Sequence, residues 1–349
     1  MKTEQLDYRL PAELIAQQPP PHRSDSRLLV LERRTGKLID SSFSSLGDFL
    51  VPGDCLVLND TKVIPARFYA RRSTGGKLEG LFMAETGPGV WQVMLKGGGK
   101  LRLGEKFYVK DRRKADFFQA RILQNNGDGV FVLQVESEGS SEAALEEIGF
   151  APLPPYIKRD DDPDVAASDR QSYQTVYASK PGAIAAPTAG LHFTEGLIEQ
   201  LKAKGILFAY ITLHVGAGTF KPITAENLDD HKMHKERFSI DETNAKLIDE
   251  TRDKGGRIVA VGTTSTRVLE TVAADMPITA WSGETDLFIK PGYEFKIVDA
   301  MITNFHLPRS TLLALVAAFA GLEKILAAYN HAIQQRYRFY SYGDAMLIV

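Results

Sequence analysis

Three polar, glycine-containing stretches lie where an expected strand is followed by an expected helix, and they are the first places where chemistry could occur. They span residues 186–194, 261–267 and 302–311. In an α/β sheet, ligands bind outside the carboxyl ends of the strands, where helix N-termini also present unpaired amides. An ordinary capped turn would explain any single stretch, but three together favour a shared site. None of them matches a Walker A or dinucleotide-binding fingerprint.

Histidines near these loops are candidates for proton transfer. Four of the seven histidines lie in or beside loops: His192, His214, His234 and His306. The imidazole titrates near neutral pH, which suits an acid or a base. His192 and His214 are the leading candidates, because each lies at a glycine-bearing loop after an expected strand, and His306 is the third. A hydrogen-bonded structural role is the alternative for each of them.

No metal site is expected from the sequence. His231 and His234, followed by Glu236, lack a third convincing ligand. The single cysteine, Cys55, excludes a disulfide framework and a cysteine-based zinc site. One cysteine also indicates a reducing, cytoplasmic compartment.

The composition is that of an ordinary folded protein. The 349 residues are 44% hydrophobic and 25% charged, and the net charge of −2 excludes a chain that is strongly basic as a whole. The N-terminus has no basic-then-apolar signal pattern. The apolar run 311–322 is shorter than the roughly 20 residues of a membrane span, so a buried core helix is expected there.

Positive charge is concentrated in one part of the chain. Residues 62–121 carry fourteen Lys and Arg against five Asp and Glu, and residues 96–114 alone carry eight against two. Scattered surface lysines would be the ordinary explanation. So local an excess instead favours a surface that faces a polyanion.

The basic segment falls within an expected antiparallel barrel. Short apolar stretches separated by turns rich in glycine and asparagine are typical of such a sheet. The expected strands are 66–72, 77–84, 90–96, 105–110, 117–124 and 130–136, followed by a helix over 142–148.

Strands and helices alternate after residue 150, which indicates an α/β domain with at least partly parallel strands. The expected strands are 183–186, 207–215 and 257–261. One helix is expected to begin after Thr194, which is a good N-cap. Four more helices are expected over 242–254, 264–274, 310–320 and 323–336. Residues 160–164, DDDPD, are expected to form a solvated acidic loop.

The first 65 residues, with expected strands at 26–32 and 54–59, are too few for a core of their own. We therefore predict a mixed α/β fold. A discontinuous α/β domain of residues 1–65 and 150–349 is interrupted by an inserted antiparallel β-barrel domain of residues 66–149.

Eight longer motifs occur in order along the chain. They are LNDTKVIPAR (58–67), PLPPYI (152–157), YQTVYA (173–178), PTAGLHFT (187–194), TLHVGAGTF (212–220), VGTTSTR (261–267), ITNFHLPRSTLL (302–313) and YRFYSYGDAMLI (337–348). Together they closely resemble the S-adenosylmethionine:tRNA ribosyltransferase-isomerase family of queuosine biosynthesis. The resemblance covers nearly the whole chain and is weakest in the acidic loop and the tips of the barrel.

The resemblance implies transfer of the ribosyl part of S-adenosylmethionine to 7-aminomethyl-7-deazaguanine at the wobble position of tRNA. The product would be epoxyqueuosine, with adenine and methionine released. The resemblance also implies an α/β domain with an inserted barrel. No metal or redox cofactor is implied, because S-adenosylmethionine is consumed as a substrate.

We assign each candidate residue a hypothetical role in that reaction. His192, His214 and His306 are acid or base candidates, and Asp60 and Asp344 are possible partners of the purine or the amine. An arginine fork suits a carboxylate, so Arg267 is expected to hold the methionine tail. The expected substrate-binding set is Thr188, Gly190, Thr219, Gly262, Thr263, Thr264, Ser265, Arg267 and Asn304. A turn or capping role is the alternative for the members other than histidine.

The tRNA is expected on the basic face of the barrel and near the C-terminus. The candidate contacts are Lys96, Lys100, Lys110, Arg112, Arg113, Lys114, Arg336 and Arg338. A wobble base lies in a single-stranded loop, where it can be splayed into a pocket without opening a duplex. A monomer is the default expectation for the oligomeric state.

Two other functions fit parts of the pattern. An S-adenosylmethionine-dependent RNA methyltransferase would share the substrate and the basic face, but would release S-adenosylhomocysteine. A non-catalytic RNA-binding factor would bind tRNA without turnover, and the three polar junctions argue against it.

Overall fold

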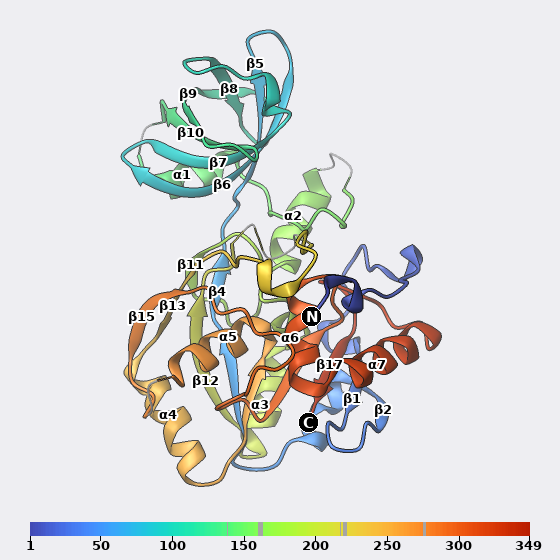
Figure 1. The fold of residues 1–349 in the computed structure, drawn as a ribbon. Coiled ribbons are helices and arrows are strands. Elements are labelled where there is room, and N and C mark those ends of the chain that lie inside the picture. The colour runs from blue at the N-terminus through green and yellow to red at the C-terminus, as the bar shows by residue number, and fades with distance from the viewer. Residues whose placement is uncertain (138, 160–162, 217, 219–221, 275–276) are drawn as a thin grey trace.

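The chain folds into a layered α/β body and a small β-barrel, which stands above the body in Figure 1. The computed structural model describes residues 1–349 except 138, 160–162, 217, 219–221 and 275–276. Both ends of the chain lie in the α/β body.

A nine-stranded mixed sheet forms the middle layer of the body, in the order β15-β13-β12-β3-β14-β16-β17-β1-β2. Its strands are β1 (Arg27–Leu31), β2 (Leu38–Ser42), β3 (Cys55–Asn59), β12 (Leu207–Leu213), β13 (Glu236–Ile240), β14 (Ile258–Val261), β15 (Trp281–Thr285), β16 (Ala300–Asn304) and β17 (Ala345–Ile348). The four central strands, β12, β3, β14 and β16, pair in parallel. Their carboxyl ends therefore meet at one edge of the sheet.

The central strands are apolar on both faces, since helices cover both sides of the sheet. Every residue of β3, β14 and β16 is buried. Along β3, Cys55 and Val57 pack into one core while Leu56 and Leu58 pack into the other. The alternation of side chains thus divides each strand between two cores.

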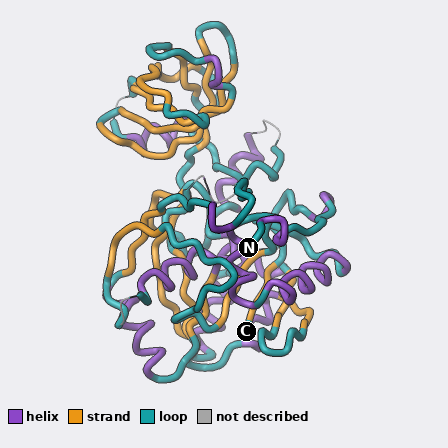
Figure 2. The backbone as a smooth tube through the Cα atoms, viewed as in Figure 1, coloured by secondary structure: helices purple, strands orange, loops and turns teal. Residues whose placement is uncertain are grey.

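Helices form the two outer layers, as Figure 2 shows in purple around the orange strands. One layer holds α3 (Glu195–Ala203) and the short helix η4 (Phe43–Phe49). The other layer holds α4 (Glu242–Asp253), α5 (Gly262–Val272), α6 (Thr311–Ala320) and α7 (Leu322–Gln334). Several begin at a side-chain cap: Thr194, Asp241 and Ser310 each accept a backbone N–H three residues on.

The barrel closes in the order β10-β7-β6-β5-β8-β9, with all pairings antiparallel. Its strands are β5 (Arg67–Arg72), β6 (Lys77–Gly87), β7 (Val90–Lys96), β8 (Lys106–Lys110), β9 (Asp116–Asn125) and β10 (Val130–Val135). Trp91 and Phe107 fill its interior, and helix α1 (Ser141–Ile148) packs Leu145 against the same core. Strand β4 (Thr61–Val63) leads from β3 into the barrel and pairs in parallel with β11 (Lys180–Ala183).

The structure confirms the predicted fold class, a mixed α/β sheet with an inserted antiparallel barrel. Strands β1, β2 and β3, from the first 65 residues, join the sheet built by the later part of the chain. Four sheet strands were not predicted: β2, β13, β15 and β17. They are short, and all except β17 carry polar residues that hide the alternation.

Three local predictions were wrong. The helix expected from residue 264 begins at Gly262, directly at the end of β14, so no loop separates the two. The strand expected over 183–186 lies over Lys180–Ala183, where β4 supplies its partner. Helix α2 (Pro163–Ser172) begins inside the expected acidic loop, since proline suits a first helical position. Residues 160–162 of that loop lie outside the described residues.

No single helix in the described part of the chain is long and apolar enough to cross a membrane. Helices α6 and α7 meet that criterion only as a pair, which is bent by 112°. Within the run 311–322, residues Thr311–Ala320 form the buried helix α6, as predicted.

Candidate functional site

The parallel strands bring polar residues together at one edge of the sheet. His214 follows β12, Asp60 follows β3, Gly262 follows β14, and Asn304 is the last residue of β16. Because β12, β3, β14 and β16 are neighbours in this order, these four positions lie side by side. The short helix η6 (Thr188–His192) packs onto the end of β16 and completes the edge.

His192 is held at both ring nitrogens. Its Nδ1 lies 2.7 Å from Ser26 Oγ, and its Nε2 lies 3.0 Å from the side-chain nitrogen of Asn304. Ser26 donates its own hydroxyl proton to the Arg23 carbonyl, so Nδ1–H donates to Ser26. Burial, with Arg23 and Arg338 nearby, lowers the pKa of His192 to about 3. His192 is therefore a neutral, oriented ring.

Asn304 is the centre of this network. Its amide nitrogen also donates to the Tyr340 carbonyl at 3.2 Å, and its amide oxygen accepts from Thr188 Oγ1 at 2.8 Å. The network joins η6, β16 and the C-terminal segment. It fixes the loop that carries His192 relative to the sheet edge.

His214 has a more open environment. The side chain is half-buried, and its Nδ1 lies 2.8 Å from Thr61 Oγ1. The pKa of His214 is lowered by burial and by Arg237, while Asp60 opposes this shift. Asp60 is itself oriented, because it accepts from Thr212 Oγ1 at 2.6 Å and from Ser179 Oγ at 2.8 Å. A neutral imidazole thus lies near a fixed carboxylate.

His306 is enclosed. Its Nε2 lies 2.7 Å from Thr303 Oγ1, and burial lowers the pKa of the ring to about 3. It lines a cavity of about 30 Å³ together with Thr188, Asn304 and the start of α5. That volume holds about one water molecule. The buried hydroxyl of Thr264, which also lines the cavity, has no hydrogen-bond partner there among the described residues.

Two glycines of the predicted site are required by the backbone or by space. Gly262 has φ of +91°, a left-handed conformation in the turn between β14 and α5. At Gly190, a Cβ would lie 2.0 Å from the Tyr177 hydroxyl oxygen and 2.9 Å from Thr175 Cγ2. Gly190 thus lets η6 pack against Thr175 and Tyr177. Gly262 lets the chain turn directly from β14 into α5.

Arg267 has partners other than a substrate in this structure. It is 6% exposed on α5, where it forms an ion pair with Glu236 and donates to the carbonyls of Leu287 and Thr285. Glu236 Oε1 accepts from Gly216 N at 2.9 Å. The pair therefore ties α5 to β13 and to the loop after His214. Thr263 and Ser265 lie on the first turn of α5, and Ser265 Oγ donates to the Val261 carbonyl.

Asp344 is likewise engaged within the fold. One oxygen accepts from Arg27 N, and the other accepts from the Arg27 guanidinium and from Arg338 N. The carboxylate is buried and joins β1 to the C-terminal turn. Asp344 directly precedes Ala345, which pairs with Asn304 at the end of β16. The carboxylate therefore lies beside the strand-end edge, although its partners come from β1 and the C-terminal turn.

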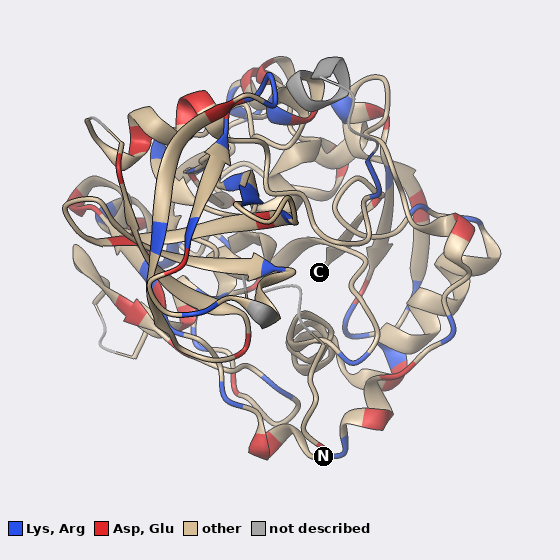
Figure 3. Ribbon diagram, turned by 90° about the horizontal axis from the view of Figure 1, so that it is seen from above, with Lys and Arg blue, Asp and Glu red and all other residues tan. Residues whose placement is uncertain are grey.

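The basic residues predicted to face tRNA fall on separate surfaces. Lys96 is highly exposed at the end of β7. Lys110 lies 3.9 Å from Asp116, Arg112 donates to the Gly149 carbonyl, and Arg113 and Lys114 form the exposed turn between β8 and β9. Figure 3 shows Lys and Arg in blue along barrel strands, with acidic residues among them.

Near the C-terminus, Arg336 is exposed, whereas Arg338 donates to the carbonyls of Gln18 and Tyr342. Two predicted residues cannot be placed: Thr219 and the side chain of Lys100 lie outside the described residues. Within the described ranges, no group of three or more His, Cys, Asp or Glu side chains is arranged to hold a metal ion.

Three residues of the site were not predicted from the sequence. Ser26 and Thr61 orient His192 and His214, and Glu236 pairs with Arg267. Thr61 is inside the motif LNDTKVIPAR, which was a usable signal. Ser26 and Glu236 lie 166 and 31 residues from their partners, so only the tertiary structure joins them.

These features define a class, an α/β enzyme scaffold with polar groups gathered at the carboxyl edge of parallel strands and a β-barrel inserted after one of them. The family model described as queuosine biosynthesis protein matches residues 3–348, and the chain belongs to this family.

Named relatives agree with that assignment. The chain is 48% identical over 352 residues to the S-adenosylmethionine:tRNA ribosyltransferase-isomerase of Halothermothrix orenii, covering 100% of both chains. It is 48% identical over 348 residues to the enzyme of the same name from Francisella tularensis subsp. novicida, again covering 100% of both. It also resembles the crystal structure of S-adenosylmethionine tRNA ribosyltransferase from Thermotoga maritima, with 39% identity and a TM-score of 0.57 over 99% of this chain and 100% of that one.

Proposed function

We infer that this protein is an S-adenosylmethionine:tRNA ribosyltransferase-isomerase. It transfers and isomerises the ribosyl moiety of S-adenosylmethionine onto 7-aminomethyl-7-deazaguanine in tRNA, giving epoxyqueuosine, adenine and methionine. The full-length identity of 48% to enzymes of this name is the observation that carries the inference. S-adenosylmethionine is consumed as a substrate.

Within this reaction, His214 is our candidate for the base that removes a ribose 5′ proton. The sulfonium acidifies that position, and a neutral imidazole can accept the proton. We propose that the Thr61 hydroxyl donates to the Lys180 carbonyl, 3.5 Å away, and accepts from His214 Nδ1–H. This arrangement leaves the lone pair on Nε2 for the substrate. Asp60 would then stabilise the imidazolium that forms.

His192 is our candidate for a positioning residue, because both of its nitrogens are bonded within the protein. Through Asn304 it would hold the wall of the strand-end cavity in place. The cavity of about 30 Å³ is too small for S-adenosylmethionine, so binding at this cavity would require η6 to move.

The tRNA is proposed to lie against the basic barrel and across the cleft between barrel and body. That cleft, of about 980 Å³, is lined by Met83 and Met94 of the barrel and by His234 and Arg267 of the body. We propose a monomer, acting in the cytoplasm.

The test is incubation with S-adenosylmethionine and tRNA bearing the aminomethyl-deazaguanine base, followed by mass spectrometry of small molecules and digested RNA. Free adenine, methionine and an epoxycyclopentanediol-bearing nucleoside are expected. S-adenosylhomocysteine with a methylated nucleoside would show a methyltransferase instead. Binding of tRNA without any product would show a non-catalytic RNA-binding factor.

A further inference from the structure

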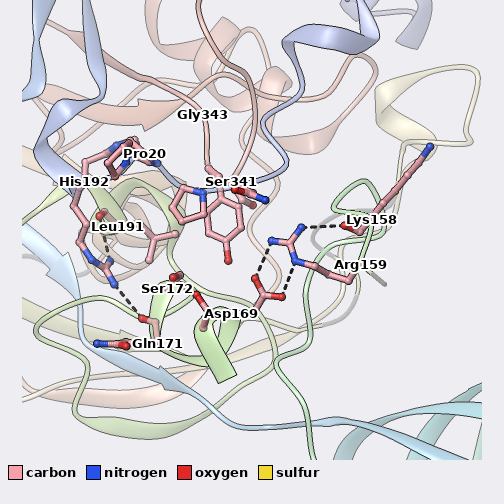
Figure 4. A pocket seen from close by; sticks show the side chains of 16 residues that line it. Pro20, Lys158, Arg159, Asp169, Gln171, Ser172, Leu191, His192, Ser341 and Gly343 are labelled. Atoms are coloured by element: carbon pink, nitrogen blue, oxygen red, sulfur yellow. Dashed lines mark hydrogen bonds and ion pairs between the residues drawn. The ribbon is translucent and has the colours of Figure 1, made fainter. Parts of the chain in front are cut away.

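A second, larger cavity adjoins the strand-end site through His192. It has a volume of about 800 Å³, within the range of ligand-binding pockets. His192 lines it, and the same ring bonds Asn304, which lines the strand-end cavity. Figure 4 shows the side chains that converge on it from η6, α2 and the C-terminal segment.

The wall of this cavity carries excess positive charge. Its charged lining residues in the described part of the chain are Arg23, Lys158, Arg159 and Asp169. Asp169 is already engaged in two hydrogen bonds with Arg159, at 2.7 and 2.8 Å, which Figure 4 draws as dashed lines. That carboxylate therefore leaves the charges of Arg23 and Lys158 uncompensated.

Arg23 is the most unusual of these cations. Its guanidinium is partly buried and donates only to main-chain carbonyls, those of Leu191 at 3.2 Å and Gln171 at 3.1 Å, in the described structure. No ion pair of Arg23 with a described carboxylate is present. Burial lowers its pKa, as expected for a cation that has lost water without gaining an anion. Two hydrogen bonds to carbonyls also fix the direction of the fork.

A buried hydroxyl also belongs to the wall of this cavity. Tyr342 is 2% exposed, lines the cavity, and its Oη has no hydrogen-bond partner among the described residues. The electrostatic neighbours of its phenol are Asp169, Arg159 and Arg23, in decreasing order. A buried polar atom without a partner is costly unless a ligand or water completes it.

We propose that this cavity is an oxyanion site, in which Arg23, with Lys158 on the same cavity, binds an anionic group of a substrate, one imidazole ring away from the strand-end cavity. The inference rests on the proposed function, which supplies two oxyanions: a phosphodiester of the tRNA and the carboxylate of S-adenosylmethionine. The volume and the apolar wall formed by Pro19, Pro20 and Pro21 favour a nucleotide with its phosphate.

The test compares Arg23→Gln, Arg23→Lys and the control Lys246→Gln, which removes an equal charge from the exposed face of α4. The KM for tRNA and the KM for S-adenosylmethionine are measured separately, each at saturating co-substrate. Loss of a charged hydrogen bond should raise one KM roughly 10- to 100-fold in Arg23→Gln. Arg23→Lys keeps the charge and should lie between it and the wild type.

Three outcomes decide the proposal. A raised KM for tRNA, with the slope of log KM against log salt reduced by about 0.7, assigns a phosphodiester. A raised KM for S-adenosylmethionine with an unchanged salt slope assigns the carboxylate. Both KM values unchanged, with only the melting temperature lowered, overturn the oxyanion site.

A second readout does not depend on turnover. Phenylglyoxal modifies accessible arginines, and peptide mapping reports the extent at Arg23. Protection by tRNA or by S-adenosylmethionine is expected, and protection by neither contradicts the proposal. Failure of the proposed function would appear separately, as a wild-type protein that releases no adenine and methionine.

Discussion

The side-chain nitrogen of Asn304 lies 3.0 Å from His192 Nε2. An amide nitrogen can only donate, so Nε2 accepts and the ring proton resides on Nδ1, where Ser26 receives it. The opposite end of the amide accepts from Thr188 Oγ1. One asparagine thus selects both the charge and the tautomer of a histidine 112 residues away.

The first prediction concerns that tautomer. Asn304→Asp places an acceptor opposite Nε2, which favours a doubly protonated ring, so the pKa of His192 should rise. Nitrogen NMR of histidine-labelled protein should show a neutral Nδ1–H ring in the wild type and an imidazolium in the variant near pH 6. We also expect turnover to fall roughly 100-fold, since Asn304 positions the wall of the strand-end cavity and a small misplacement is costly. An identical ring spectrum in both proteins would contradict the assigned network.

The second prediction concerns His214 as the base. His214→Asn should lower kcat roughly 100-fold or more with the fold retained. In the wild type, kcat/KM should fall on the acid side with a midpoint below 6.5, because the pKa of His214 is lowered and only the neutral ring accepts a proton. The acid limb should disappear from the residual activity of the variant. His331→Asn, which alters a surface histidine beside Asp40, serves as the matched control.

The third prediction separates two roles of Arg267. Removing one member of a buried ion pair leaves the other charge unpaired and costs about 3–5 kcal/mol. Arg267→Gln and Glu236→Gln should therefore each reduce the free energy of unfolding, and the double variant should lose less than their sum. Denaturant titration gives these values. A stable Arg267→Gln variant whose only defect is a raised KM for S-adenosylmethionine would instead identify Arg267 as the partner of the methionine carboxylate.

The fourth prediction concerns acid stability. Burial holds the pKa of His192 and of His306 at about 3 in the folded state, below the value of about 6.5 in an unfolded chain. The unfolded state therefore binds more protons, and stability is lost as pH falls from about 6.5 towards 3. Each ring contributes about 1.4 kcal/mol per pH unit in that window.

Denaturant unfolding at pH 7, 6 and 5 measures the slope of the unfolding free energy against pH. His306→Asn should reduce it by the contribution of one ring, whatever its effect on stability at pH 7. His22→Asn, at an exposed position, should leave the slope unchanged. Equal slopes for all three proteins would be evidence against neutral buried rings.

The fifth prediction concerns the barrel. Replacing Lys110, Arg112, Arg113 and Lys114 by Gln should raise the KM for tRNA more than it changes kcat, and should flatten the salt dependence of binding. Arg113 should carry more of the effect than Lys110 and Arg112, since these two have acidic neighbours at 3.9 and 3.7 Å. Four exposed lysines on or directly after α3 and α4 offer a matched control set: Lys202, Lys204, Lys246 and Lys254. Salt-insensitive tRNA binding by the wild type would argue against this surface.

The sequence by itself determined the fold class and the order of the parts. The barrel strands could be recognised because short apolar stretches alternate with glycine-rich turns, a local signal. Helices such as α3 and α4 could be recognised because Thr194 and Asp241 cap them locally. The motifs around His192, His214 and Asn304 likewise pointed to the strand ends without reference to any contact.

Only the tertiary structure decided what those residues do. Arg267 and Asp344 appear in the sequence as available charged side chains, and the fold pairs them with Glu236 and Arg27. His192 appears as a free imidazole, and the fold occupies both of its nitrogens. The reason is physical: charge state and hydrogen bonding depend on burial and on partners far along the chain, and neither quantity is encoded in the local spacing of residues.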